Sequence, residues 1–577
     1  MNSTVVCRVN VPHLHRKFIR IEAKYPSNAD VLVLQLPVWR PGRYERADFA
    51  KNIKSWQAFG TQQEKLAFKK TGLSTWEVAT SGSPEITIVY EYYANILNAG
   101  SSFVNEDLLY INPVNCFLFD PVRPFLSFQI ELDIPDDWST ATGMQIETHR
   151  LLSAKDFQQL ADCPILSSPN LAHLQYTIDR TVFHLRVYGE LAMERHRILE
   201  DFKRFTEAQL RAFGSFPEPE YHFLFLLTPW AHYHGVEHEN STVIVLGPAA
   251  NISEGNLYSE LLGICSHELY HTWNVKKIRP LEMQPYDFSL PALSELGFVT
   301  EGVTTYFGDQ FLHRCGLLSD QQYFGELEKL LDKHFDNPGR ENYSLAQSSF
   351  DTWLDGYSAG IPWRKVSIYN EGALCAFIAD VTIIKHSENR RSLDDVMRLM
   401  NKRYGVSGIG YTESDYLQAL EETSGISFSW LFDQLIHGTE SYFTFLLQAF
   451  ESIGLELAVK PSEKAWEGWL GIRLDEKMEI LGVLPDSPAD RAGLWPGMKI
   501  LSWNGIAIAK TSELSAHIDP TEQIKISFSL NGKIAAATVE PEGIPQYKKH
   551  LLRLKEHPGE EKLKAFHFWK YRLPLDS

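Results

Sequence analysis

The segment Ser266–Trp273 (SHELYHTW) sets two histidines four positions apart, with a glutamate directly after the first. In a helix, residues i and i+4 lie on one face, so the imidazoles of His267 and His271 can reach a single ion. Glu268 lies about 100° further round the helix, where its carboxylate faces a water on that ion rather than the ion itself. Two histidines, a third protein ligand and one open position are typical of catalytic zinc. The five-residue pattern also arises by chance in large proteins, so other parts of the chain have to support it.

A two-histidine zinc site needs a third protein ligand, and a carboxylate on a neighbouring helix is the usual source. Glu301 stands in the apolar run Gly297–Phe307. A carboxylate in such a stretch is unfavourable to bury without a cation, and a metal supplies that cation. We therefore expect Glu301 to complete the metal shell, with a cap at the start of the helix as the alternative role. The competing carboxylates Glu282 and Glu295 do not lie on comparably apolar helices.

The 577 residues exceed what one hydrophobic core organises and predict roughly three or four domains. Up to about residue 190, alternating runs such as Val31–Leu36 and Glu85–Tyr93 predict an antiparallel β-domain. Beyond it the apolar period becomes helical, apart from short strands. Helices are expected over 193–213, 254–275, 300–315, 321–335, 372–384, 392–404 and 413–423. After about residue 450 short strands return, and Gln546–Trp569 is predicted to be a charged helix.

The composition excludes several classes of partner. The formal net charge of −18 argues against nucleic acid or an anionic membrane as the main partner. Six scattered cysteines without a C-x-x-C pair favour reduced thiols over a disulfide framework. The N-terminal stretch lacks the unbroken apolar core of a secretory signal, and no apolar run approaches the roughly 20 residues of a membrane span. We therefore expect a cytoplasmic protein.

Three segments carry longer motifs: His267–Pro280, Phe298–Tyr306 and Pro37–Tyr44. The first resembles a signature in which the metal-binding helix runs on into Trp-Asn-Val-Lys-Arg-Ile-Arg-Pro. The second resembles Phe/Trp-x-x-Glu-Gly-x-Thr-x-Tyr, and the third resembles Pro-x-Trp-x-Pro-Gly-x-Tyr. Together they are similar to the glycyl aminopeptidase family, which are gluzincin zinc metallopeptidases with a C-terminal PDZ domain. From its residues alone, the loop Pro37–Tyr44 is either the rim of a site or a rigid turn between domains.

The resemblance covers nearly the whole chain and implies a multidomain α+β fold. Residues 1–190 would form an N-terminal antiparallel β-domain, and residues 191–450 a thermolysin-like, mostly helical zinc peptidase domain. Residues 451–545 would form a PDZ domain, and residues 546–577 a C-terminal helical tail. The expected partners are peptide substrates, with no nucleic acid and no membrane.

By this resemblance, His267, His271 and Glu301 bind one Zn²⁺ per chain, and Glu268 acts as the general base. The base takes a proton from water as the water attacks the carbonyl carbon, and passes it to the leaving amine. A base in such a position contributes about 10²–10⁴-fold to the rate.

Gly235–His238 resembles the family's Gly-Gly-Leu-Glu-His segment, which implies that Glu237 anchors the substrate's free α-amine and that Gly235 borders the substrate. The alternative for Glu237 is a solvated acidic residue on a loop. His234 stands where the family commonly has glycine, which adds bulk near the substrate. With His232 and His238 it also suggests a second metal site, although three histidines on a loop are more often polar contacts.

The family's oxyanion-stabilising tyrosine lies in a Tyr-x-Lys-Gly motif, which Tyr369-Asn370-Glu371-Gly372 resembles. The tyrosine and the glycine are kept, and Glu371 replaces the lysine. A phenol donor facing the developing charge contributes about 2.7–4 kcal/mol. The alternative is that Tyr369 is only a packed aromatic ring.

Residues 465–540 resemble a PDZ domain, with Leu470, Gly471 and Ile472 in its carboxylate-binding loop. The ligand of such a loop is the C-terminal carboxylate of a peptide, which adds a strand to the sheet.

The sequence therefore predicts a zinc aminopeptidase, with a preference for small first residues such as glycine or alanine taken from the resemblance. One alternative is a zinc endopeptidase, which has no need of an amine anchor at Glu237. The other is a PDZ peptide-binding scaffold with a degenerate zinc site, against which the intact metal-binding residues count.

Overall fold

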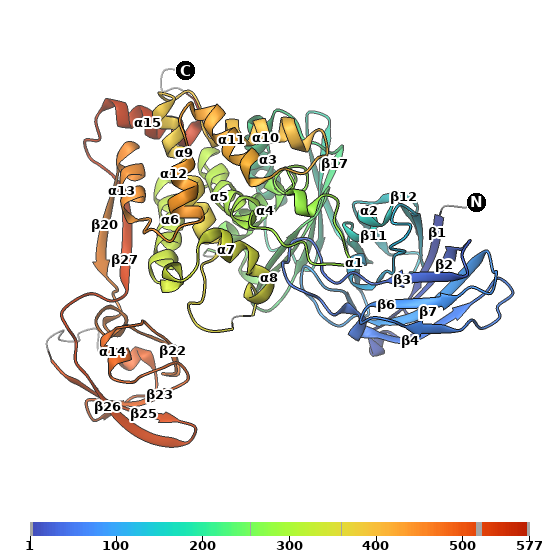
Figure 1. Ribbon diagram of the computed structural model, residues 1–577, viewed down its shortest axis with the longest axis horizontal. Helices are drawn as coiled ribbons and strands as arrows, with labels where there is room; N and C mark the ends of the chain where they lie inside the picture. Colours follow the sequence, from blue (N-terminus) through green and yellow to red (C-terminus); the bar gives the residue numbers. More distant parts are fainter. Residues whose placement is uncertain (1–3, 254–255, 359, 515–521, 574–577) are drawn as a thin grey trace.

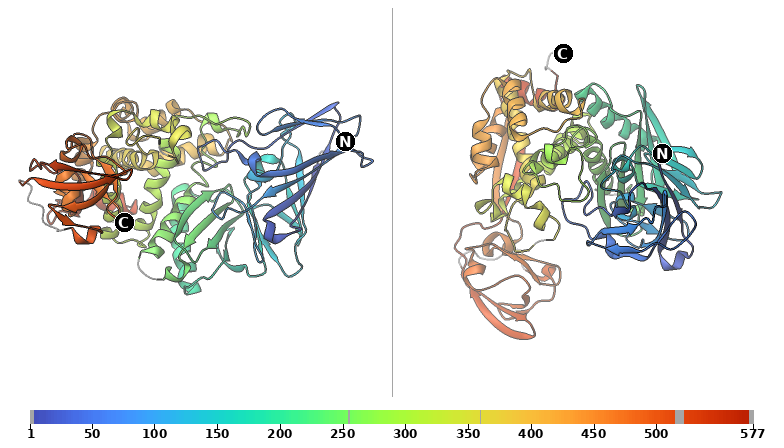
Figure 2. Two further views of the ribbon diagram at one scale, coloured as in Figure 1. Left: turned by 90° about the horizontal axis from the view of Figure 1, so that it is seen from below. Right: turned by 45° about the vertical axis from the view of Figure 1, so that its right-hand side comes forward.

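The computed structural model describes residues 4–253, 256–358, 360–514 and 522–573. A β-rich N-terminal domain and a small C-terminal β-module lie on opposite sides of a mostly helical central region (Figures 1 and 2). The chain is therefore a multidomain α+β protein, as its sequence predicts. Within the described residues, no helix has both the length and the apolar character needed to cross a membrane.

The N-terminal domain is built on a seven-stranded sheet in which buried and exposed residues alternate, as in β1. In spatial order its strands are β12 (Gln145–Thr148), β13 (Leu151–Ala154), β10 (Ser127–Leu132), β1 (Thr4–Asn10), β2 (Phe18–Pro26), β7 (Glu85–Tyr93) and β4 (Ile53–Phe59). The prediction of an antiparallel domain is wrong for one pair, because β1 and β10 run parallel. Two smaller sheets accompany it.

One smaller sheet has three strands, in the order β3 (Val31–Gln35), β6 (Thr75–Ala79) and β5 (Phe68–Lys70). The other has four strands, in the order β11 (Ser139–Ala141), β14 (Ile165–Ser168), β9 (Leu109–Ile111) and β8 (Phe103–Val104). Two short helices, α1 (Pro113–Cys116) and α2 (Phe157–Ala161), lie between these strands in the chain.

A mixed five-stranded sheet leads into the helical region. In order it contains β15 (Ala172–Ile178), β16 (Thr181–Tyr188), β17 (Glu220–Leu227), β19 (Ser241–Gly247) and β18 (His232–Glu237). The three central strands are parallel and both edge strands are antiparallel. The sheet spans residue 190, the expected limit of the N-terminal domain. The amphipathic helix α3 (Arg195–Phe213) connects β16 to β17 and ends at Gly214, whose φ of 91° suits glycine.

The helical region contains α4 (Leu257–Tyr270), η5 (Phe298–Val303), α5 (Thr304–Arg314), α6 (Asp320–Phe335), α7 (Leu345–Phe350), α8 (Thr352–Asp355), α9 (Ile368–His386), α10 (Leu393–Met400), η7 (Asn401–Gly405), α11 (Glu413–Ser424), α12 (Ser429–Leu431), η8 (Phe432–Ile436) and α13 (Phe443–Ser452). The helix predicted over 254–275 ends earlier, at Tyr270, and its first two residues lie outside the described residues. The helix predicted over 372–384 begins earlier, because the Ser367 side chain caps α9.

The C-terminal module has its own hydrophobic core, separate from the large core that the N-terminal domain and the helical region share. Its elements are η9 (Trp466–Leu470), β21 (Ile472–Leu474), β22 (Ile480–Val483), α14 (Pro488–Arg491), β23 (Lys499–Trp503), β24 (Ile506–Ala507), β25 (Ile524–Leu530) and β26 (Lys533–Val539). The first strand of this module, β21, begins at Ile472, directly after a π-helical turn and Gly471.

The chain leaves this module through β27 (Lys548–Leu554), which pairs with β20 (Leu455–Pro461), and ends in α15 (Glu560–Tyr571). The prediction of a helix over 546–569 is therefore wrong for its first half, where the partner strand imposes pairing. Trp569 on α15 is fully buried and its Nε1 donates to the Tyr306 hydroxyl at 2.9 Å. The last helix thus packs into the helical region rather than remaining loose.

Candidate active site

The three predicted zinc ligands lie together at the end of α4. The Nε2 atoms of His267 and His271 are 3.1 Å apart. The Oε2 atom of Glu301 lies 3.8 Å from Nε2 of His267 and 3.4 Å from Nε2 of His271. His271 and Glu301 are buried, whereas the His267 side chain keeps 20% of its surface exposed. The donor atoms therefore border one small space that solvent reaches from the side of His267.

A hydrogen bond on its other ring nitrogen orients His271. Nδ1 donates to the Asn274 carbonyl oxygen at 2.7 Å, which leaves Nε2 facing Glu301. The Asn274 amide in turn donates to the Val299 carbonyl at 2.9 Å and to the Thr304 hydroxyl at 3.0 Å. Such bonds fix the ring orientation and the tautomer of a metal-binding histidine. Sequence reasoning assigned no role to Asn274, although it lies within the motif that follows the two histidines.

Glu301 lies in a π-helical turn, η5, rather than in a regular α-helix. Turns of this kind are frequent at functional sites. A Cβ atom on Gly302 would lie 2.3 Å from the Cα atom of Gly372 on α9, so no larger residue fits at this contact. The glycines of the two motifs therefore meet each other, and their contact brings α9 over the turn that carries Glu301.

The loop Pro37–Tyr44 of the N-terminal domain forms one wall of the site. The Tyr44 hydroxyl donates to Oε1 of Glu301 at 2.7 Å. The loop is held on the helical region by Trp39, whose Nε1 donates to the Asp287 carbonyl at 2.7 Å. It is therefore both a rigid contact between domains and a rim of the site, and Tyr44 is a site residue that sequence reasoning did not single out.

Glu237 ends strand β18 and is buried, so the interpretation as a solvated loop residue is wrong. Its Oε1 atom is buried and has no hydrogen-bond partner among the described residues. A Cβ atom on Gly42, which has a φ of 75°, would lie 2.3 Å from Oε2 of Glu237. The loop backbone thus covers the Glu237 carboxylate, and one of its oxygens is left for another partner.

Glu268 faces β18 at Gly235. A Cβ atom on Gly235 would lie 2.3 Å from Oε1 of Glu268, so the glycine lets the strand approach this carboxylate. Glu268 is buried, and among the described residues its Oε2 atom has no hydrogen-bond partner. Ligand atoms of Glu237, Glu268 and His271 lie within 4.8 Å of one another. The two carboxylates therefore border the same space as the metal-type cluster.

A buried ion pair holds the strand end that carries Glu237. Asp162 of the N-terminal domain accepts hydrogen bonds from Lys276 Nζ at 2.8 Å, from His238 Nδ1 at 3.0 Å and from the Glu239 backbone amide at 2.9 Å. Lys276 is fully buried at its side chain. One carboxylate thus joins the segment after α4 to the β18–β19 connection, a link that no local sequence pattern predicts.

A cavity of about 530 Å³ runs along α4 and is lined near the cluster by Gly235, His267, Glu268 and Tyr369. Tyr369 lies in the first turn of α9. Burial and the Glu301 carboxylate raise the pKa of Tyr369 well above its usual range, so the phenol stays protonated at neutral pH.

Tyr357 is a second phenol near this end of the cavity. Its hydroxyl oxygen accepts a hydrogen bond from the Tyr44 backbone amide at 3.2 Å. Burial and Glu301 raise the pKa of Tyr357 to about 12. The sequence offered no motif that singled this residue out.

The two departures from the family pattern have local explanations. Glu371 is buried in the first turn of α9 and accepts a hydrogen bond from Nδ1 of His334 on α6, so it joins two helices. His234 also borders the cavity, but its Nδ1 accepts a hydrogen bond from the Ala99 backbone amide at 3.3 Å. Among the described residues, His234 is not part of any metal-type cluster, nor are His232 and His238.

The buried carboxylates of the site favour a cation between them. Burial raises the pKa of Glu268 well above its usual range. Burial alone would lower the pKa of His271, but the carboxylates of Glu301, Glu237 and Glu268 together outweigh it and raise the value to about 9. The imidazoles of His271 and His267 hold the pKa of Glu301 below its usual range against the effect of burial. The carboxylates of the site therefore favour positive charge beside His271, which a divalent cation would supply.

The donor set fits zinc. Two imidazole nitrogens and one carboxylate oxygen, with one side open, are the ligands of a catalytic zinc site. The outer hydrogen bonds of His271 and Glu301 to Asn274 and Tyr44 supply the orientation that such ligands require.

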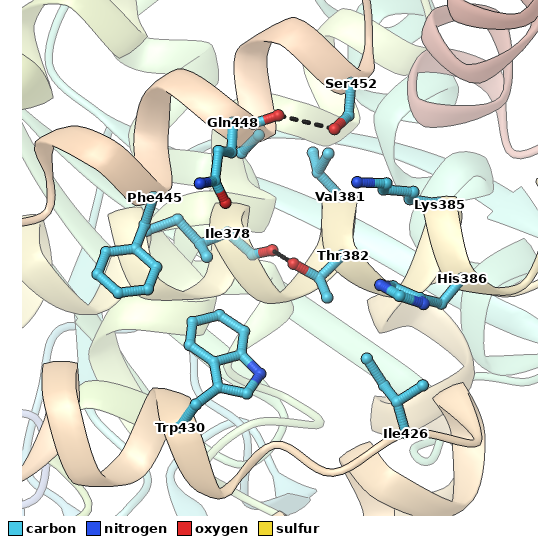
Figure 3. Close-up of a pocket in the computed structure, with 11 residues that line it drawn as sticks. Ile378, Val381, Thr382, Lys385, His386, Ile426, Trp430, Phe445, Gln448 and Ser452 are labelled. Carbon is cyan, nitrogen blue, oxygen red and sulfur yellow. Dashed lines mark hydrogen bonds between the residues drawn. The ribbon is translucent and has the colours of Figure 1, made fainter.

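A second cavity, of about 230 Å³, lies between α9, α12 and α13 and lacks this chemistry (Figure 3). The rings of Trp430 and Phe445 stack at 5.4 Å along one side. The hydroxyl groups of Thr382 and Ser452 each donate to a carbonyl of their own helix. No carboxylate is among the described residues that line it, and His386 is its single imidazole among them, so it lacks the two-histidine and carboxylate set of the first site.

Two family models and several solved structures are similar to this chain. The Peptidase M61 N-terminal domain model matches residues 7–169, and the M61 glycyl aminopeptidase model matches residues 260–375. A solved structure of an aminopeptidase N family protein from Idiomarina loihiensis shares 23% sequence identity, with a TM-score of 0.91 over 98% of this chain and 99% of that chain. An M1 zinc metallopeptidase from Deinococcus radiodurans, a mutant bound to a Tyr-Ser-Ala substrate, shares 13% identity, with a TM-score of 0.49 over 76% of this chain and 94% of that chain. No curated protein matches the chain in sequence.

The likeness to the Idiomarina protein shows that the fold is shared along nearly the whole chain. The two matched segments include the loop with Tyr44, the α4 motif with Glu268, the η5 turn with Glu301, and Tyr369. Residues 7–169 and 260–375 therefore match the N-terminal and catalytic domains of the M61 glycyl aminopeptidase family, and the catalytic match identifies the chain as a zinc metallopeptidase.

Proposed function

We propose that the enzyme removes the first residue of peptides whose α-amine is free, and that Glu237 binds this amine. The observation that carries the proposal is the buried Oε1 atom of Glu237, which has no hydrogen-bond partner among the described residues. A buried carboxylate oxygen is favourable only when it is paired. A substrate ammonium group supplies a charge-assisted partner of the right sign.

The position of Glu237 also supports cleavage from the chain end. Gly42 covers this carboxylate on one side, and Tyr44 of the same loop contacts Glu301. The cavity is lined by Gly235 and Tyr369, and none of its described lining residues belongs to the loop Pro37–Tyr44. We propose that a peptide bound at Glu237 extends along α4 and not toward this loop. An endopeptidase needs room on both sides of the cleaved bond.

We assign His267, His271 and Glu301 as the zinc ligands and Glu268 as the general base. Zinc bound there supplies a Lewis acid and a water that is nucleophilic near neutral pH. Glu268 has a free carboxylate oxygen that faces the cluster, and Gly235 keeps the other oxygen close to the strand. Glu268 accordingly takes the proton of the attacking water and delivers it to the leaving amine.

The close approach of the backbone to Glu237 and Glu268 also supports a preference for substrates whose first residue is small. Gly235 and Gly42 each approach a carboxylate so closely that a Cβ atom at either position would lie 2.3 Å from it. The space between Glu237 and Glu268 is therefore bounded by backbone rather than by a side-chain pocket. We propose glycine and alanine as the preferred first residues.

A panel of dipeptide amides tests this function. Amides that begin with glycine or alanine should be cleaved faster than those that begin with leucine, and N-acetylated versions should resist cleavage because they lack the ammonium group. A chelator should abolish cleavage, and added zinc should restore it. Equal cleavage of free and acetylated substrates would exclude the aminopeptidase assignment and favour the endopeptidase alternative.

Tyr369 is proposed to donate a hydrogen bond to the oxyanion. The substitution Tyr369→Phe should lower kcat by about 10²–10³-fold with little change in KM, because the phenol acts only on the charge that develops in the transition state. Steady-state kinetics on a glycine amide measures the effect. Tyr357→Phe is the matched control, since it removes the neighbouring phenol. A larger loss of kcat in Tyr357→Phe would move the oxyanion role to that residue.

Residues 451–545 are proposed to form a PDZ domain. Their separate core, the four-stranded sheet β24-β23-β25-β26 and the hairpin β21–β22 support this interpretation. Leu470, Gly471 and Ile472 would receive a peptide C-terminus. Gly471 has a φ of 77° between a π-helical turn and β21, but its backbone amide donates to the Glu467 carbonyl at 3.2 Å. A carboxylate would have to compete with that bond.

A further inference from the structure

A second cluster of metal-type side chains lies on the five-stranded sheet, on the face turned away from α4. His184 and His222 alternate along their strands with Phe183 and Tyr221, which pack into the main core. The Tyr221 hydroxyl donates to the backbone carbonyl of Glu268 at 3.4 Å. Because successive side chains of a strand point to opposite faces, His184 and His222 face away from the catalytic helix.

The register of the sheet brings three potential ligands together. β16 and β17 are parallel, and His184 pairs directly with His222. Their rings stack with centroids 4.7 Å apart and an interplanar angle of 14°. Glu220, two residues before His222 on the same face, has its Oε2 atom 3.7 Å from Nε2 of each histidine. Ligand atoms of all three residues lie within 4.8 Å of one another.

The carboxylate stands before both imidazoles without a hydrogen bond to either, since 3.7 Å exceeds the length of such a bond. His184 and His222 are 9% and 8% exposed, whereas the Glu220 side chain is 55% exposed at the mouth of the cluster. The Nδ1 atom of His222 is also buried without a hydrogen-bond partner among the described residues. The two imidazoles are thus buried, and their Nε2 atoms stand near the exposed Glu220 carboxylate without a hydrogen bond to it.

One further histidine orients the cluster. Nε2 of His173 on β15 and Nδ1 of His184 are 3.0 Å apart and share a hydrogen bond. This bond occupies the far nitrogen of His184 and leaves its Nε2 atom directed at Glu220, which is the arrangement that metal-binding histidines use. Arg186 lies two residues along β16 on the same face, and its charge opposes a bound cation.

We propose that His184, His222 and Glu220 bind a second divalent transition-metal ion of the zinc type, with solvent completing its coordination. Zinc accepts imidazole nitrogen and carboxylate oxygen at about 2.0–2.2 Å, so the 3.7 Å separations would have to shorten and the stacked rings of His184 and His222 would have to turn toward Glu220 for both Nε2 atoms to reach one ion. The ion would join β16 to β17 beside Tyr221, which supports the catalytic helix. This site is separate from the catalytic centre and does not depend on the proposed substrate.

The test counts zinc in the full-length protein. The protein is stripped with a chelator, saturated with Zn²⁺, separated from free metal and analysed by atomic emission. Wild type should hold two zinc ions per chain. Glu220→Gln should hold one and keep its aminopeptidase activity, which also shows that it is folded. Glu301→Ala should also hold one but lose activity, and the combined variant should hold none.

Glu200→Gln is the matched control. Glu200 is an exposed carboxylate on α3 that pairs with a single histidine, His196, at 3.0 Å, and its loss should leave two zinc ions bound. The proposal is overturned if wild type binds only one zinc, or if Glu220→Gln still binds two. Retention of both ions by Glu301→Ala would instead count against the assigned catalytic ligand, so the two failures can be told apart.

Discussion

Replacement of Glu268 by glutamine is expected to lower kcat by about 10²–10⁴-fold while the zinc content stays at the wild-type level. The amide keeps the shape of the carboxylate but cannot accept the proton of the attacking water. The metal-type cluster is formed by His267, His271 and Glu301, so this change removes no assigned ligand. Glutamine is neutral and nearly isosteric with glutamate, so the change introduces neither a buried charge nor a cavity. Steady-state kinetics and metal analysis on the same preparation measure both quantities.

Glu295→Gln is the control for this experiment, because Glu295 is an exposed carboxylate that competed with Glu301 for a role at the metal. It should change neither kcat nor zinc content. Substantial activity in Glu268→Gln would show that another group accepts the proton. Loss of zinc in Glu268→Gln would instead mean that this carboxylate is a ligand.

Elements whose signals are local could be predicted from the sequence. α6 and α11 begin at capping boxes, Ser319 with Gln322 and Thr412 with Asp415, and both helices follow the apolar period. β27 could not be predicted as a strand, because its partner β20 lies almost a hundred residues earlier and supplies the pairing. The parallel pairing of β1 with β10 is hidden for the same reason. The residues of a strand do not by themselves determine which other strand it pairs with.

The residues of the site also fall into those that could be predicted from local sequence and those that could not. The two histidines and Glu268 share one helical turn, so their spacing is sufficient to predict that they lie together. Glu301 could be inferred because a carboxylate in an apolar run needs a cation. Tyr44 could not, since its bond to Glu301 joins residues 257 positions apart across two domains. Asp162, which binds Lys276 and supports the strand of Glu237, is hidden by the same distance in sequence.

The proposed exopeptidase character depends on the amine-binding role assigned to Glu237, and Glu237→Gln should lower kcat/KM for peptides with a free amine by roughly 100-fold or more. Loss of one partner of a buried ion pair costs about 3–5 kcal/mol, and each 1.4 kcal/mol is about tenfold. The free enzyme should not lose stability, because Oε1 of Glu237 has no hydrogen-bond partner among the described residues that the change would break.

The diagnostic result is the dependence on the substrate's amine. Glu237→Gln should leave the slow cleavage of N-acetylated peptides unchanged, because those peptides carry no ammonium group to lose a partner. Glu239→Gln is the control: this neighbour pairs with Lys277 at 2.7 Å in a half-buried ion pair, and its loss should not discriminate between the two substrates. An equal loss on free and acetylated peptides would show that Glu237 shapes the site without binding the amine. The amine anchor would then have to be sought elsewhere around the metal.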